Sequence, residues 1–189
     1  MHNNLNIYYF INNFNSEEIK KLNKRVSIIY RNYSAPLDLN LIKKIRDNCA
    51  LQKRKFFIAN NLKIAKNLRL DGIYIPSFNR LPNFKNLNVH KEFKIIGSAH
   101  NNEQLTNKKN QGCTEIFIAP IFKTKKTNLF LGVTKFNLLS KSTNIKVIAL
   151  GGIDSSNYKK LRLTNCIGFA AIGWIKKTGL TKLGRFLNF

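Results

Sequence analysis

Glycines follow the last two apolar runs of the sequence, in a pattern typical of phosphate-binding loops. Gly151 and Gly152 come directly after one run, and Gly173 closes the next. Glycine lets a backbone approach a ligand closely, and a helix that begins just beyond it presents unbonded N–H groups to a phosphate. We expect such a helix to begin at Asp154 or Ser155, so that two neighbouring helix N-termini cradle one phosphate. The alternative is that these glycines only permit tight turns.

Two further residues at the ends of apolar runs could carry chemistry. Arg31 ends such a run, and an unpaired cation in a buried position is costly. We therefore favour an anionic ligand as its partner over a structural ion pair. His100 could transfer protons or contact an anion, but a histidine at this kind of position more often orients a loop, and we favour that interpretation.

Eight short runs rich in β-branched and aromatic residues recur along the chain, most of them about 20 to 30 residues apart. Strands that alternate with helices imply βαβ units and a parallel sheet, and eight units favour a compact (β/α)8 TIM barrel over a flavodoxin-like open sheet. We expect one α/β domain over residues 1–189. The strands are expected at Asn6–Ile11, Val26–Arg31, Phe56–Asn60, Gly72–Pro76, Phe93–Ser98, Glu115–Pro120, Lys146–Gly151 and Ile167–Gly173.

Segments with helical spacing lie between several of these runs. In such a barrel the binding site lies at the carboxyl ends of the strands, where the glycines and Arg31 fall. Helices are expected from Ser16, which would cap the first of them, over Leu39–Ala50 and Leu62–Leu68, from Asn102, and from the Asp154 region through Tyr158 and Leu161.

The composition is strongly basic, with a net charge of +24 from 33 Lys and Arg against 9 Asp and Glu. One interpretation is attraction to polyanions, either nucleic acid or phosphorylated substrates. The other is codon bias, since Lys, Asn and Ile have AT-rich codons and the charges are spread along the whole chain. We favour codon bias, and the sequence shows no RNP, KH or helix-turn-helix pattern. We therefore expect phosphorylated small molecules as partners rather than nucleic acid.

No apolar run is long enough to span a bilayer, and the N-terminus does not resemble a signal peptide. We expect a cytoplasmic protein that does not bind membranes, and we keep a homodimer open as an alternative to a monomer. Cys49, Cys113 and Cys166 are widely spaced among apolar neighbours. This pattern predicts small buried side chains rather than disulfides or a zinc site.

Several motifs together resemble the thiamine phosphate synthase / TenI superfamily. The strongest is GCTEIFIAPIFKT at residues 112–124, which is similar to the family's GPIFpT segment, and Val147–Ile153 is similar to its pvvAiGGI segment. Ser98-Ala99-His100 fits the family's SxH, residues 71–75 fit its DGvHL, and Arg31 fits the arginine of its QLR. The order and spacing of all five agree, which makes the set specific.

The resemblance implies a barrel that joins hydroxymethylpyrimidine diphosphate to a thiazole phosphate and releases diphosphate, with Mg²⁺ as cofactor. It implies that Arg31 and Ser98 contact the diphosphate, together with a lysine of the loop after Thr124, and that Thr124 itself binds substrate or phosphate. The family's lysine position aligns on Thr127, so Lys126 is the substitute we expect. Gly151, Gly152 and Gly173, with Ile172 before the last of them, would hold the thiazole phosphate.

Some family positions hold other residues in this chain. The two carboxylates that hold Mg²⁺ align on Asn60 and Asn79, and a neutral amide is a poorer ligand for a hard dication. Asn60 could still contact the substrate. The histidine of DGvHL aligns on Tyr74, and the histidine that thiazole tautomerases of the superfamily can carry aligns on Pro120. A tautomerase and a non-catalytic phosphate-binding barrel remain alternatives to a synthase.

Overall fold

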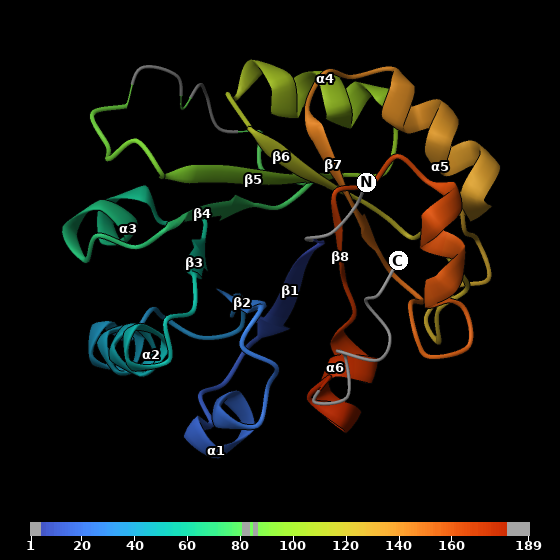
Figure 1. Ribbon diagram of the computed structural model, residues 1–189. Coiled ribbons are helices and arrows are strands. Elements are labelled where there is room, and N and C mark those ends of the chain that lie inside the picture. Colours follow the sequence, from blue (N-terminus) through green and yellow to red (C-terminus); the bar gives the residue numbers. More distant parts are fainter. Residues whose placement is uncertain (1–4, 81–83, 85–86, 181–189) are drawn as a thin grey trace.

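The computed structural model describes residues 5–80, 84 and 87–180, which form a closed barrel of eight parallel strands (Figure 1). The strands pair in chain order, and β1 closes the ring against β8 with Asn6 opposite Gly168. This confirms the predicted (β/α)8 barrel and excludes the open sheet. The strands are β1 Asn6–Ile11, β2 Val26–Tyr30, β3 Phe56–Ala59, β4 Gly72–Ile75, β5 Lys94–Ala99, β6 Glu115–Ile118, β7 Lys146–Leu150 and β8 Gly168–Ala170.

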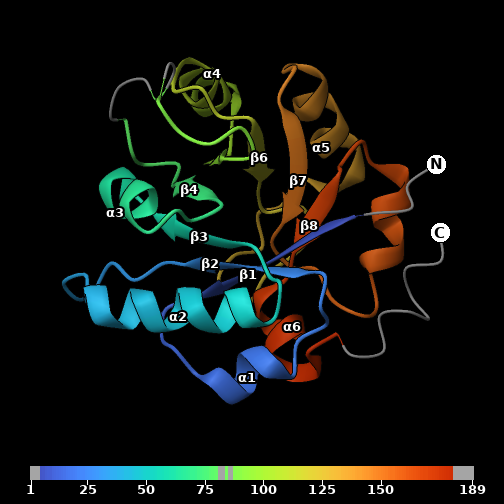
Figure 2. The same ribbon diagram turned by 60° about the vertical axis from the view of Figure 1, so that its left-hand side comes forward.

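Helices surround the ring, and Figure 2 shows α1, α2 and α3 outside the first strands. Four helices begin at a side chain that accepts a hydrogen bond from the first turn, and these caps are Asn15, Asp38, Asn61 and Asn101. Asn15 therefore caps the first helix, in place of Ser16. The helices are α1 Ser16–Lys20, α2 Leu39–Leu51, α3 Leu62–Asn67, α4 Asn102–Asn110, α5 Gly132–Lys141, the 3₁₀ helix η1 Tyr158–Leu163, and α6 Ile172–Thr178.

Two predictions about the last units were wrong. The helix expected at Asp154 or Ser155 is the 3₁₀ helix η1, which begins only at Tyr158. The Asp154 carboxylate accepts hydrogen bonds from the Ser156 N–H at 2.8 Å and the Ser156 hydroxyl at 2.6 Å, a local turn that competes with helix formation. Strand β8 ends at Ala170, because residues from Ile172 onward already form α6.

The core has two layers. Inside the ring, aromatic side chains fill the barrel, with ring centroids 5.1 Å apart for Phe10 and Tyr74 and 5.3 Å apart for Tyr8 and Phe117. Outside it, aliphatic side chains pack between strands and helices. Such alternation of inward and outward residues makes the barrel interior a packed core, so ligands can bind only at its ends.

The amino-terminal end of the barrel is closed by a buried charge. Glu115 is 3% exposed, accepts a hydrogen bond from the Tyr8 hydroxyl and pairs with Lys94. Burial and the nearby Glu115 carboxylate raise the pKa of Tyr8 well above its usual range. Tyr8, Glu115 and Lys94 thus satisfy one another at this end of the barrel.

The three cysteines are buried and unpaired, as predicted. Burial raises the pKa of Cys49 and of Cys113 to about 12, so both thiols stay protonated near neutral pH. Within the described residues, every helix is too short or too polar to cross a membrane.

Candidate functional site

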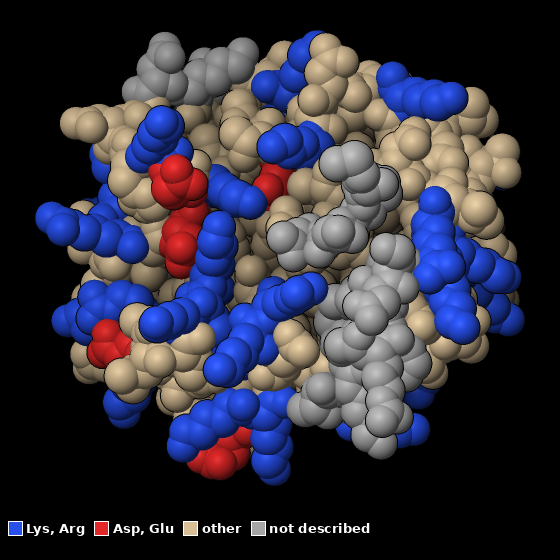
Figure 3. All heavy atoms as spheres, viewed as in Figure 1, with Lys and Arg blue, Asp and Glu red and all other residues tan. Residues whose placement is uncertain are grey.

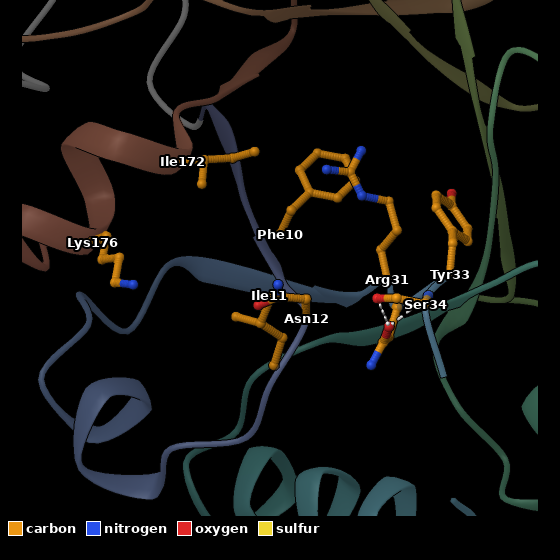
Figure 4. Close-up of a pocket in the computed structure, with 9 residues that line it drawn as sticks. Phe10, Ile11, Asn12, Arg31, Tyr33, Ser34, Ile172 and Lys176 are labelled. Carbon is orange, nitrogen blue, oxygen red and sulfur yellow. Dashed lines mark hydrogen bonds between the residues drawn. The ribbon is translucent and has the colours of Figure 1, made fainter. Parts of the chain in front are cut away.

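A hollow of about 670 Å³ opens at the carboxyl ends of β1 and β2, beside α6 (Figure 4). We call it the mouth hollow. Arg31 and Ile172, both predicted from the sequence, contribute to it. Its lining is Phe10, Ile11, Asn12, Arg31, Asn32, Tyr33, Ser34, Ile172 and Lys176.

Arg31 projects over the mouth hollow. Its guanidinium carbon lies 4.7 Å from the centroid of the Phe10 ring, and its backbone N–H donates to the Ile11 carbonyl at 2.8 Å. The ring face attracts the cation without neutralising it. Arg31 takes part in none of the ion pairs found within residues 5–80, 84 and 87–180. The structure therefore presents an arginine that is fixed in place and open to an anion.

Tyr74 connects Arg31 to Ser98. The buried Tyr74 hydroxyl donates to the Ser98 hydroxyl oxygen at 2.9 Å. Burial raises the pKa of Tyr74, while this hydrogen bond and the nearby Arg31 charge lower it in part. Arg31 and Ser98, the two residues expected to contact the diphosphate, are thus connected through the Tyr74 hydroxyl. Tyr74, which stands where the family has histidine, completes that path.

Asn60 and Asn79 also come together, as their alignment on a shared metal site requires. The Asn79 side-chain amide donates to the Asn60 side-chain oxygen at 2.7 Å. Asn60 has a left-handed backbone with φ of 57°, a conformation that asparagine tolerates better than most residues. Its N–H donates to the Tyr74 carbonyl at 3.0 Å, which fixes it beside β4.

This pair does not fit Mg²⁺. Both side chains are neutral, and one of the two amide oxygens already accepts a hydrogen bond. A magnesium site in proteins normally includes at least one carboxylate. All nine Asp and Glu residues lie in the described part of the chain, where no group of three or more His, Cys, Asp or Glu is arranged to hold a metal.

A buried lysine that the sequence did not indicate supports this side of the barrel. Lys108 of α4 is 0% exposed, and its amine donates to the Asn79 carbonyl at 2.7 Å and to the Gln111 side-chain oxygen at 2.8 Å. Loss of hydration lowers the pKa of Lys108 to about 8. Lys108 therefore holds the backbone that carries Asn79.

The glycine pair after β7 has a packing reason. Gly151 and Gly152 have φ of 94° and 71°. A Cβ on Gly151 would lie 2.7 Å from the Pro120 Cβ, and one on Gly152 would lie 2.3 Å from the Lys123 carbonyl oxygen. The tight-turn alternative is therefore sufficient to explain both residues.

Gly173 differs, since no atom lies within 4 Å of the position its Cβ would take. It stands in the first turn of α6, in which the Ile175 N–H donates to the Ala171 carbonyl. The N–H groups of Ile172 and Gly173 precede that bond, and such groups at a helix start have no intrahelical acceptor. Of these two residues, Ile172 lines the mouth hollow and Gly173 does not.

The loop after β6 is shaped by Thr124. Its hydroxyl oxygen accepts from the N–H groups of Lys126 at 3.3 Å and Thr127 at 3.2 Å. Lys126 is exposed, and neither it nor Thr124 lines the mouth hollow. His100 orients a neighbouring loop, as predicted, through 2.7 Å between its Nδ1 and the Ala119 carbonyl oxygen.

Lys176 and Tyr33 are mouth-hollow residues that the sequence analysis missed. Figure 4 shows the Lys176 amine turned from α6 toward the end of β1. A signal was present for Lys176, because it follows Ile172 by four residues and so shares its helix face. The apolar run of residues 167–173 instead predicts a strand that includes Ile172 and ends before Lys176.

Comparison with known proteins agrees with this geometry. The family model described as thiamine monophosphate synthase matches residues 13–175. The chain belongs to this family. A thiamine-phosphate synthase of Pelagibacter ubique is 31% identical over 159 residues, which cover 80% of this chain and 76% of that protein.

Two other family comparisons differ in coverage. A thiamine-phosphate synthase of Prochlorococcus marinus is 31% identical over 129 residues, and the match spans 64% of this chain but only 35% of that protein. The thiamine phosphate pyrophosphorylase of Pyrococcus furiosus superposes with a TM-score of 0.76 over all of this chain and 99% of that structure, at 18% identity. The latter likeness supports the fold of this family member.

Proposed function

We propose that this chain is a thiamine-phosphate synthase-type transferase in thiamine biosynthesis, which joins hydroxymethylpyrimidine diphosphate to a thiazole phosphate. The observation that carries the proposal is Arg31, which forms no ion pair with a described carboxylate, lines a hollow of about 670 Å³ and is connected to Ser98 through Tyr74. A site that must bind a leaving diphosphate needs such a cation more than it needs a strong base.

In the proposed reaction the bond between the pyrimidine methylene carbon and the diphosphate oxygen breaks. The electron pair leaves with diphosphate, and a pyrimidine methyl cation develops. The thiazole nitrogen then supplies the electron pair of the new C–N bond. Negative charge accumulates on the diphosphate, so Arg31, Ser98 and Lys176 would stabilise the transition state by facing that group.

The remaining site residues take supporting roles in this proposal. The N–H groups of Ile172 and Gly173 would bind the thiazole phosphate, with the Gly151-Gly152 turn beside them. Thr124 would hold the loop from which Lys126 reaches the diphosphate. Asn60 would offer hydrogen bonds to substrate. No step uses a protein-held Mg²⁺, because Asn60 and Asn79 do not form a fitting donor set.

A synthase is favoured over a tautomerase because Pro120 occupies the position where tautomerases of the superfamily can carry a histidine, and proline cannot transfer protons. A non-catalytic binding barrel differs from a synthase by the absence of turnover. A cytoplasmic location, a homodimer as an alternative to a monomer, and a single domain over residues 1–189 stay predictions.

The test is product formation by the purified chain. Hydroxymethylpyrimidine diphosphate and thiazole phosphate would be supplied with Mg²⁺ and, separately, with a chelator. The proposal predicts that thiamine phosphate and diphosphate appear in equal amounts. Binding of both compounds without turnover in either condition would contradict the synthase proposal and favour a non-catalytic binding protein.

A further inference from the structure

A second hollow lies at the opposite, amino-terminal end of the barrel. It has a volume of about 260 Å³, and six of its eleven lining residues are Lys or Arg while none is acidic. We call it the floor hollow. Its cations come from the starts of β2, β3 and β5 and are Lys24, Arg25, Lys53, Arg54, Lys55 and Lys94. Figure 3 shows Lys and Arg side chains spread over one face of the molecule, with few acidic side chains among them.

Arg54 joins the two loops that carry most of these cations. It is only 6% exposed, and its guanidinium donates to the backbone carbonyls of Leu22, Asn23 and Val26. Its Nε also donates to the Gln52 side-chain oxygen at 3.0 Å. Arg54 is therefore occupied within the protein, and it fixes the loop before β2 against the loop before β3.

Most charges on these two loops have no ion-pair partner among the residues that the structure describes. Lys94 pairs with Glu115, so it adds no net charge. Lys24, Arg25, Lys53 and Lys55 are exposed and belong to none of the ion pairs among the described residues. Lys53 also has a left-handed backbone, with φ of 53°, which is uncommon for lysine. Four exposed cations thus line one small hollow, and the two loops that carry them are joined by Arg54.

We propose that the floor hollow binds a compact oligophosphate. Such a ligand carries several negative charges in a small volume and would relieve the repulsion among the four cations. The hollow is smaller than a typical site for a drug-sized ligand, which begins at about 300 Å³. Tyr8, the aromatic residue in its lining, is buried and cannot offer a face for base stacking, so a nucleic-acid strand is the less suitable occupant. This site is separate from the mouth hollow and does not depend on the proposed function.

The test is calorimetric titration of the full chain with inorganic triphosphate at about 0.15 M salt, where charges more than about 8 Å apart are largely screened from one another. The variant Lys24→Glu/Lys55→Glu replaces one cation of each loop with a carboxylate. Its matched control, Lys43→Glu/Lys44→Glu, makes the same charge change on exposed positions of α2. A third variant, Arg31→Ala, disables the mouth hollow, and thermal melting establishes that each variant is folded.

The proposal predicts that triphosphate affinity falls at least about tenfold in Lys24→Glu/Lys55→Glu, which is about 1.4 kcal/mol. Affinity in the control should stay within about threefold of the original. In Arg31→Ala the titration should lose only binding at the mouth hollow and should keep the binding event that Lys24→Glu/Lys55→Glu weakens. An equal loss in both charge-reversal pairs would overturn the proposal in favour of a general surface field. Loss confined to Arg31→Ala, or a single-stranded oligonucleotide that triphosphate cannot displace, would overturn it as well.

Discussion

The two halves of the barrel mouth differ in whether their polar side chains are paired within the protein. On the side of β3, β4 and α4, polar groups bond to one another, as the Asn60–Asn79 amide pair and the Lys108 amine on the Asn79 carbonyl show. On the side of β1, β2 and α6, Arg31 and Lys176 face the mouth hollow and belong to none of the ion pairs in the described part of the chain. The difference indicates which half is built for an anion. The half that aligns with a metal site is instead closed by its own amides.

The largest effect is expected from Arg31→Ala. If Arg31 faces the leaving diphosphate, its loss should lower kcat/KM for thiamine phosphate formation by about 10²- to 10³-fold, the usual consequence of removing a group that stabilises transition-state charge. Steady-state kinetics would measure this. Arg46→Ala, on the surface of α2 and paired with Asp47, is the matched control and should leave the rate unchanged. Similar losses in both variants would mean that total charge matters and position does not.

The next effect lies in the opposite half of the mouth. Lys108 should make the free energy of unfolding depend on pH. Its pKa is about 8 in the folded chain, below the ordinary lysine value. Between pH 8 and pH 10 the unfolded chain therefore binds more protons than the folded one at this residue, and its contribution to the free energy of unfolding rises with pH. The rise should amount to roughly 2 kcal/mol and should be absent from Lys108→Met.

Denaturant unfolding at several pH values would measure that difference. Lys109→Met serves as control because Lys109 is the exposed neighbour on the same helix. A Lys108→Met curve that kept the slope of the original chain would show that Lys108 titrates normally.

A smaller effect is expected from Lys176→Ala. Lys176 is a single flexible cation at the edge of the hollow, so its removal should weaken binding of hydroxymethylpyrimidine diphosphate by about tenfold. The measurement is KM together with equilibrium binding. Lys177→Ala changes the next residue of α6, which points elsewhere on the helix, and should change neither. Equal effects of the two substitutions would show that Lys176 does not contact the substrate.

The smallest effect is expected when a divalent metal is added to the protein in the absence of substrate. Titration with Mn²⁺, followed by its electron paramagnetic resonance signal, should detect no binding to the original chain below millimolar concentration. Asn60→Asp/Asn79→Asp restores two carboxylates and should create binding. Micromolar Mn²⁺ binding by the original chain would show that the amide pair does hold metal, and would break the contrast between the two halves.

The barrel was predictable from the sequence because each strand is a short apolar run and the runs recur at βαβ spacing. The boundaries around the last two strands were less predictable. A side-chain turn at Asp154 delayed the next helix to Tyr158, and Ile172 continued an apolar run although it already belonged to α6. Local hydrogen bonds of this kind override periodicity.

The candidate site was predictable where chemistry and position coincided. Arg31, an arginine at the end of a buried strand, was found for that reason, and its link to Ser98 through Tyr74 depends on a contact between strands that sequence spacing does not encode. Lys108 was not predicted because an isolated lysine in a polar helix is normally exposed. Gly151 and Gly152 were assigned to phosphate binding, while the close approach of the loop after β6 accounts for them equally well.

The most direct test of the contrast is equilibrium binding of hydroxymethylpyrimidine diphosphate without divalent metal. Three proteins would be compared by calorimetry: the original chain, Arg31→Ala, and Asn60→Ala/Asn79→Ala. The account predicts that binding is lost in Arg31→Ala and retained within a few-fold in the asparagine variant. Retained binding in Arg31→Ala, together with loss in the asparagine variant, would contradict it. The diphosphate would then bind on the side of β3, β4 and α4.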